Sequence, residues 1–163
     1  MISVRILEMN RFMGKLLKGE NFDAFLLKEG FLRTGMEYRF NGRVFPEYFD
    51  TEEQERHTED YTYWGEVKPF VFELVKGKRT PLAFSFTLLL AKNDTTEFLA
   101  RRSVNVGEDV PSLFLQVRFE HGVGRMITGT ARNMFTLDKS LEEAWDLEVR
   151  QLLKAMELAV EEE

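Results

Sequence analysis

The most apolar stretch of the chain, Leu82–Ala91, constrains the fold more than any other segment. Five large apolar residues alternate there with smaller or polar ones, which is the period-2 pattern of a β-strand with one buried face. These five are Leu82, Phe84, Phe86, Leu88 and Leu90. We therefore expect a buried strand at the centre of the fold.

The composition is that of a single globular domain. The chain has 163 residues, of which 44% are hydrophobic and 31% charged, enough for one full core. It has no cysteine, which excludes disulfides and thiolate chemistry and is compatible with a reducing cytosol. The start of the chain lacks the apolar stretch of a signal peptide, and the longest apolar run is about half of a membrane span. We expect a cytoplasmic protein with no membrane partner.

The first part of the chain predicts a strand, a helix and then several strands. A short strand is expected over Ile2–Leu7. Apolar residues at helical spacing predict a helix from Met9 to Leu17, with Asn10 as its cap and Gly19 at its end.

Three strands are expected next, at Ala24–Lys28, Phe31–Phe40 and Arg43–Phe45. Asn41-Gly42 is a strong two-residue hairpin signal, so we place the turn between the last two strands there. Residues 47–60 hold seven acids and one basic residue, which is typical of a solvated loop.

Two interpretations of Trp64–Val75 remain open. Apolar residues recur at helical spacing, but Pro69 lacks the backbone N–H group that donates a hydrogen bond in a helix interior. The segment is either a helix with Pro69 in its first turn, or a strand from Phe70 followed by a hairpin loop at Lys76–Pro81. We favour the helix.

The second half predicts another helix, two strands and a long terminal helix. Asp94–Glu97 has the spacing of a capping box that opens a short helix. Alternation predicts strands over Leu113–Phe119 and Arg125–Phe135. A second capping box at Ser140–Glu143 opens the long C-terminal helix, and Glu161–Glu163 oppose its dipole, so we expect them to fray.

Together these elements predict an α+β domain over residues 1–163, an antiparallel sheet packed by helices. The order β-α-β-β(-β) occurs twice, over residues 2–45 and 82–135, which indicates an internal duplication. An acidic loop and linking helix at 46–81 join the copies, and the C-terminal helix covers 140–160.

The duplicated order resembles a DNA sliding-clamp domain. Leu113–Val117 and the later Thr128–Thr130 are similar to the strand pair that follows the helix in bacterial clamps. In clamps, two helices present basic residues to DNA phosphates. The resemblance implies that role here for Arg11, Lys15, Lys18, Arg101 and Arg102.

Nearly the whole chain also resembles an uncharacterised bacterial family of unknown function. The resemblance is carried by Phe12–Leu17, Lys76–Leu82 and Phe135–Trp145. It implies a bacterial cytosolic protein and no activity.

The basic turn Lys76–Pro81 is a candidate site for an anion. A phosphate loop would need glycine where Phe72 stands and a hydroxyl where Arg79 follows Lys78. Lys76, Lys78 and Arg79 could still bind an anion as a plain turn, although a solvated turn is the favoured interpretation.

The sequence assigns no catalytic, cofactor or metal-binding residue. It contains no nucleophile elbow and no dinucleotide fingerprint, and its two histidines stand alone. We expect a non-catalytic binding or assembly protein whose partner is a second copy or another protein. The alternatives are a small-molecule enzyme with an unlocated site and a clamp-like nucleic-acid-associated protein, and nucleic acid is the less favoured partner. The candidate contacts for an anion are Arg11, Lys15, Lys18, Lys76, Lys78, Arg79, Arg101 and Arg102.

Overall fold

The strand expected at the centre of the fold is β5 (Ala83–Leu90), which lies between β2 and β6 in an antiparallel sheet. The computed structural model describes residues 1–163. Phe84, Phe86 and Leu88 are buried, whereas Leu82 is 65% exposed and Leu90 is only partly buried. The prediction of a buried central strand is confirmed, with three apolar side chains on its fully buried face rather than five.

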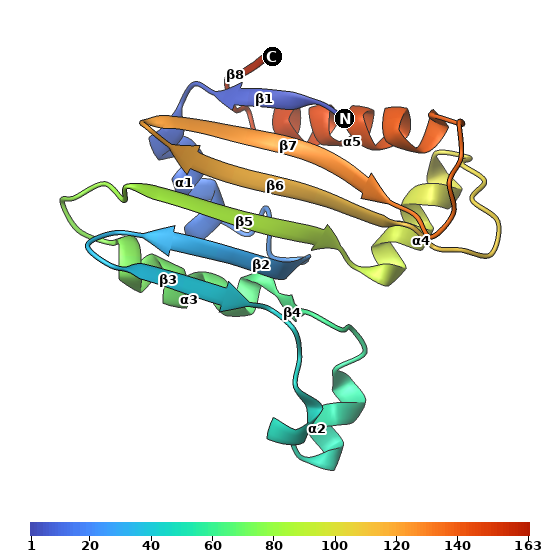
Figure 1. Ribbon diagram of the computed structural model, residues 1–163, viewed down its shortest axis with the longest axis horizontal. Coiled ribbons are helices and arrows are strands. Elements are labelled where there is room, and N and C mark those ends of the chain that lie inside the picture. The colour runs from blue at the N-terminus through green and yellow to red at the C-terminus, as the bar shows by residue number, and fades with distance from the viewer.

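The α+β class is also confirmed. One sheet of eight strands runs in the order β3-β2-β5-β6-β7-β1-β8, and β4 pairs with β2 beside this path (Figure 1). The other strands are β1 (Ser3–Ile6), β2 (Phe25–Arg33), β3 (Glu37–Asn41), β4 (Thr62–Tyr63), β6 (Ser112–Glu120), β7 (Val123–Ala131) and β8 (Val160–Glu162).

Helices cover one face of this sheet, and the other face carries no helix (Figure 1). The core joins side chains from the covering helices, such as Phe12 and Trp145, to the buried face of the strands. On the uncovered face, Ser85, Thr87 and Gln116 are partly exposed. The covering helices are α1 (Met9–Leu17), α3 (Trp64–Val75) and α5 (Ser140–Ala155), and α4 (Lys92–Arg101) lies at the end of the sheet beside α5. No helix is both long and apolar enough to cross a membrane.

The hairpin predicted at Asn41-Gly42 is wrong. The β2–β3 turn lies at residues 34–36, and Arg43 forms only an isolated bridge with Tyr61. A Cβ on Gly42 would lie 1.7 Å from the Leu27 carbonyl oxygen. The glycine is therefore required by close backbone packing and not by a turn.

The helix interpretation of residues 64–75 is confirmed, and Pro69 lies inside α3. The predicted caps elsewhere are wrong. None of the helices α1, α4 and α5 has a side-chain hydrogen bond at its N-cap, and α4 begins two residues before Asp94. The solvated loop at 47–60 contains a short helix, α2 (Thr51–Arg56), which follows the 3-10 turn η1 (Pro46–Tyr48).

The C-terminal helix ends at Ala155, and the expected fraying of the tail is wrong. Residues 160–162 form β8, which pairs with β1. Each tail carboxylate pairs with an arginine: Glu161 with Arg5, Glu162 with Arg150, and Glu163 with Arg125. Arg5 and Arg125 come from distant parts of the chain and Arg150 from the preceding helix, so the acidic run is neutralised by the fold.

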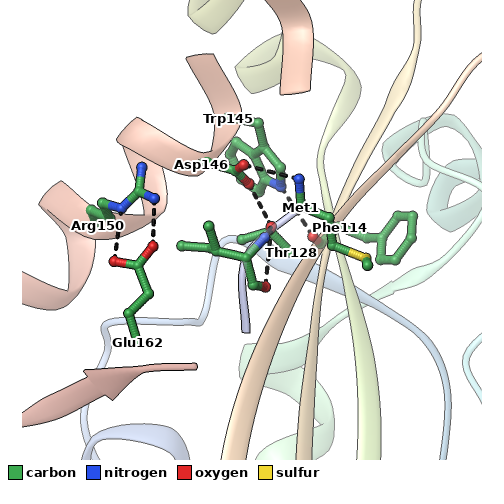
Figure 2. Close-up of polar contacts among 8 residues, drawn as sticks. Met1, Phe114, Thr128, Trp145, Asp146, Arg150 and Glu162 are labelled. Atoms are coloured by element: carbon green, nitrogen blue, oxygen red, sulfur yellow. Dashed lines mark hydrogen bonds and ion pairs between the residues drawn. The ribbon is translucent and has the colours of Figure 1, made fainter. Parts of the chain in front are cut away.

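Figure 2 shows how α5 is fixed to the sheet. Asp146 is buried; its carboxylate accepts hydrogen bonds from the Thr128 hydroxyl at 2.5 Å and from the Met1 amine at 3.0 Å. The Trp145 indole N–H donates to the Phe114 carbonyl at 3.0 Å. These contacts serve packing, and they lie away from the groove described below.

The order β-α-β-β does occur twice, as β1-α1-β2-β3 and β5-α4-β6-β7. The two first strands take different places, because β5 is central and β1 lies near the edge, paired with β7 and β8. The internal duplication stays a prediction.

Candidate functional site

A groove of about 530 Å³ lies between α1 and the loop that joins α3 to β5. It is open to solvent rather than enclosed. Its lining includes four basic residues and no acidic residue. The apolar part of the lining consists of Met9, Met13, Leu17, Phe72, Val75, Phe84 and Phe119, and the basic part of Lys18, Lys76, Lys78 and Arg79; we call this the basic groove.

Side-chain contacts fix α1 to α3, the helix whose last turn contributes to the lining of the basic groove. The Trp64 side chain is fully buried, and its indole N–H donates to the Leu16 carbonyl at 2.8 Å. This bond satisfies one of the last carbonyls of α1, which has no partner within the helix. Lys68 of α3 adds bonds to the Gly19 carbonyl at 2.8 Å and to Asp23 at 2.6 Å. The parts of the lining that α1 and α3 contribute therefore have a fixed relative position.

The charges on the rim differ in how far they are neutralised. Lys76 pairs with Glu73 at 2.5 Å, whereas Lys78 and Arg79 make no ion pair and are exposed. The Lys18 ammonium lies 5.3 Å from the centre of the Phe72 ring, close enough for a cation–π contact. Lys78 and Arg79 are thus the rim charges most available to an anion.

Gly14 makes room inside the groove. It lines the groove from the middle of α1, and a Cβ built on it would have no neighbour within 4 Å. A glycine inside a helix costs about 0.5–1 kcal/mol relative to alanine. Packing in the present structure does not require this glycine, so the space above it is free for a ligand.

The structure brings four of the eight sequence-predicted contacts together in the basic groove, namely Lys18, Lys76, Lys78 and Arg79. Arg11 and Lys15 lie on α1 outside the lining, and Arg11 is within 3.5 Å of Glu157.

Arg101 and Arg102 lie on the other side of the molecule and bind Glu148 of α5. Arg101 contacts both carboxylate oxygens, at 2.8 and 3.0 Å, and Arg102 contacts one of them at 2.5 Å. Both guanidinium groups are thereby partly neutralised. The structure holds α1 against α3 and α4 against α5, so the basic residues of the two helices do not form one surface.

This cluster predicts a pH dependence of stability. Hydrogen bonding from Arg101, joined by Arg102, holds the pKa of the Glu148 carboxyl below its usual value, against the opposing effect of burial. Because the pKa is lower in the folded chain, the stabilisation is complete above the pKa of unfolded glutamate and is lost as the pH falls through the folded value. Glu148→Gln should lower the free energy of unfolding by about 1–2 kcal/mol at pH 7.

Urea titrations at pH 7 and at pH 3 would measure the effect. The difference between the native chain and Glu148→Gln should shrink at the lower pH, where the native carboxylate becomes protonated. Glu143→Gln is the matched control, because Glu143 lies on the same helix, is exposed and makes no ion pair. An equal difference at both pH values would contradict the assignment of this pKa to the ion pair.

The sequence did not reveal the apolar part of the groove. Met9 and Met13 are predicted as part of the core-facing stripe of α1, and they do pack partly against the core. The available signal was Gly14, a glycine that interrupts the middle of this helix without a turn to explain it. Elsewhere, no group of three acidic or histidine side chains is close enough to hold a metal ion, and the His57 ring lies tilted against the Phe49 ring, with 4.3 Å between centroids.

The comparison with protein families places the chain in one of them. The sequence model of a family of unknown function, DUF5721, matches residues 15–161, and the chain belongs to this family. No curated protein matches the chain, and no solved structure matches it. The resemblance to sliding clamps therefore stays a prediction.

Proposed function

We propose that the protein is a non-catalytic binding protein whose basic groove holds an acidic, amphipathic peptide segment of a partner protein. The observation that carries this proposal is the lining of the groove, in which an apolar floor is combined with four basic residues and no acid. Apolar side chains of the segment would lie on the floor, and its carboxylates would face the rim.

The form of the groove favours a peptide over a small molecule. A volume of about 530 Å³ is within the range of small-ligand sites, but those sites bury most of their ligand. This groove is open, so a small apolar ligand would remain largely exposed to solvent, whereas an extended peptide segment can cover the groove. Methionine side chains such as Met9 and Met13 adapt their shape, which suits a peptide-binding surface.

The expected location is the cytoplasm. This part of the proposal is supported by the cysteine-free composition, which is compatible with a reducing compartment.

Binding of a synthetic peptide tests the proposal. A fluorescein-labelled peptide that combines phenylalanine and glutamate residues should bind the chain, and fluorescence anisotropy would measure its Kd. The double substitution Lys78→Glu, Arg79→Glu should raise the Kd at least tenfold, which corresponds to about 1.4 kcal/mol. Raising the salt concentration should also weaken binding, because the rim charges are exposed and screened.

Two further variants test whether binding depends on the shape of the groove and on the position of its charges. Gly14→Leu should weaken binding because its side chain would enter the groove, while leucine is a better helix former than glycine, so that stability is kept. The control Arg118→Glu, Lys139→Glu makes the same change of charge at two exposed positions outside the groove. If the control weakens binding as much as the groove variant, or if a peptide with lysines in place of glutamates binds equally well, the proposal is wrong.

A further inference from the structure

Residues 45–60 form an acidic arm that projects from the sheet, and none of the residues in its two helical turns is buried (Figure 1). It is the most acidic part of the chain. Its seven acids are Glu47, Asp50, Glu52, Glu53, Glu55, Glu59 and Asp60, against a single Arg56.

The acidic arm also presents aromatic side chains to solvent. Tyr48 is 86% exposed and Phe45 is 51% exposed, at the start of the arm and beside its acids. A large aromatic side chain with this exposure is an anchor of the kind that dominates binding energies when it enters a pocket. The arm therefore has the amphipathic, acidic character that the basic groove requires.

The acidic arm is folded before it meets a partner. The Asp50 carboxylate caps α2 by accepting from the Glu53 amide at 2.8 Å, and the Gln54 side chain donates to the Pro46 carbonyl at 2.7 Å. At the base of the arm, the Val44 amide donates to the Asp60 carbonyl at 2.8 Å. A preformed segment loses less conformational entropy on binding than a disordered one.

The arm cannot reach the groove of its own chain. It joins the body next to Tyr63, which precedes the first residue of α3, whereas the groove lies at the last turn of α3 and the loop beyond it. The 12 residues of α3 span about 18 Å between these two places. Figure 1 shows α2 and the loop between α3 and β5 at separate ends of the molecule.

We propose that the acidic arm of one copy docks in the basic groove of a second copy of this chain. This inference rests on the proposed function and names the partner. Tyr48 and Phe45 would contact the apolar floor, and the acids around them would face Lys78 and Arg79. Because arm and groove are different surfaces, the contact is heterologous and joins copies head to tail, in a closed ring or an open chain.

The contact of one short arm is small compared with a standard interface of about 1,600 Å². Association should therefore be weak, and it should weaken further as salt screens the exposed charges. The full chain is expected to form oligomers that dissociate on dilution and on addition of salt.

A charge exchange between arm and groove tests the pairing directly. One variant carries Lys78→Glu and Arg79→Glu, and a second carries Glu47→Lys, Glu52→Lys and Glu55→Lys in the arm. Each variant alone has lost one of the two complementary net charges, because the groove then carries two charges of each sign, or the arm four of each sign. Its self-association should therefore be at least tenfold weaker than that of the native chain. An equimolar mixture should associate again as heterodimers, because the native arm of the first variant meets the native groove of the second. Sedimentation velocity over a range of concentrations would measure all of these states.

The outcomes separate this inference from the function on which it rests. A native chain that stays monomeric at every concentration, or a mixture that fails to associate, overturns the pairing between copies. If the phenylalanine–glutamate peptide still binds the groove in that case, the groove function stands and its partner is another protein. If neither the peptide nor a synthetic peptide of residues 45–60 binds, both proposals fail.

Discussion

Trp64→Ala is expected to lower the free energy of unfolding by about 3–5 kcal/mol, since the substitution empties a fully buried site. The Trp64 ring packs against Phe86 at 5.0 Å between centroids, and its indole bond to Leu16 holds α1 to α3. The loss is a large part of the total stability of a typical domain, about 5–15 kcal/mol. Urea unfolding followed by circular dichroism would measure it.

Trp64→Phe gives a milder test of the same claim. Phenylalanine keeps most of the packing but cannot donate to Leu16, so about 1–2 kcal/mol should be lost and peptide binding to the groove should weaken. Trp145→Phe is the matched control, because it also removes an indole bond, to Phe114, in a part of the fold away from the groove. It should lose similar stability and keep peptide binding. Equal effects of the two variants on binding would show that Trp64 does not position the groove walls.

Gly42→Ala is expected to have the second large effect. The new Cβ would lie 1.7 Å from the Leu27 carbonyl oxygen, so β2 and the base of the acidic arm would have to move apart. The Gly42 amide and carbonyl bind Lys28 and Thr62, at 3.0 and 2.8 Å, and these bonds would be strained by the movement. Overpacking of this kind costs about 1–3 kcal/mol and occasionally more, and a clash with backbone belongs at the upper end.

Thermal or urea unfolding of Gly42→Ala would measure the loss, with Gly35→Ala as its control. A Cβ on Gly35 would have no neighbour within 4 Å, and Gly35 has no positive φ angle. Its substitution should leave stability within about 0.5 kcal/mol of the native value. If Gly42→Ala is equally harmless, the close approach of Gly42 to β2 is wrong.

The parts of the fold that the sequence predicts well are long segments with one buried side. The alternation in β6 agrees with the buried side chains of Leu113, Leu115 and Val117, and the helical spacing of residues 64–75 outweighed Pro69. In such segments a single periodicity decides both the type of element and the face that it buries.

The missed parts depend on contacts between distant residues. Asn41-Gly42 has the sequence of a hairpin turn, but glycine is required at position 42 because the backbone of Leu27 in β2 lies against it. Glu161–Glu163 form a repulsive run when taken alone. In the fold, β8 pairs with β1, and the three carboxylates are neutralised by Arg5, Arg125 and Arg150. Local patterns carry no information about such partners.

The sequence predicts the basic loop of the candidate site but not its neighbours in the fold or its apolar floor. The basic loop at Lys76, Lys78 and Arg79 is visible as a motif, whereas its position beside Lys18 follows from the packing of α1 against α3. The apolar floor could not be separated from the core, because Met9 and Met13 belong to the same helical stripe as Phe12, which is fully buried.

The central claim is that the basic groove binds an acidic, amphipathic segment, and NMR titration tests it most directly. The ¹⁵N-labelled chain with Glu47→Lys, Glu52→Lys and Glu55→Lys, in which the arm is not expected to occupy the groove of another copy, would be titrated at low salt with the phenylalanine–glutamate peptide. We predict saturable amide shift changes that cluster in Met9–Lys18 and Val75–Thr80 and that disappear in Lys78→Glu, Arg79→Glu. Shift changes confined to the uncovered sheet face around Ser85 and Gln116, or none at all, would contradict the claim.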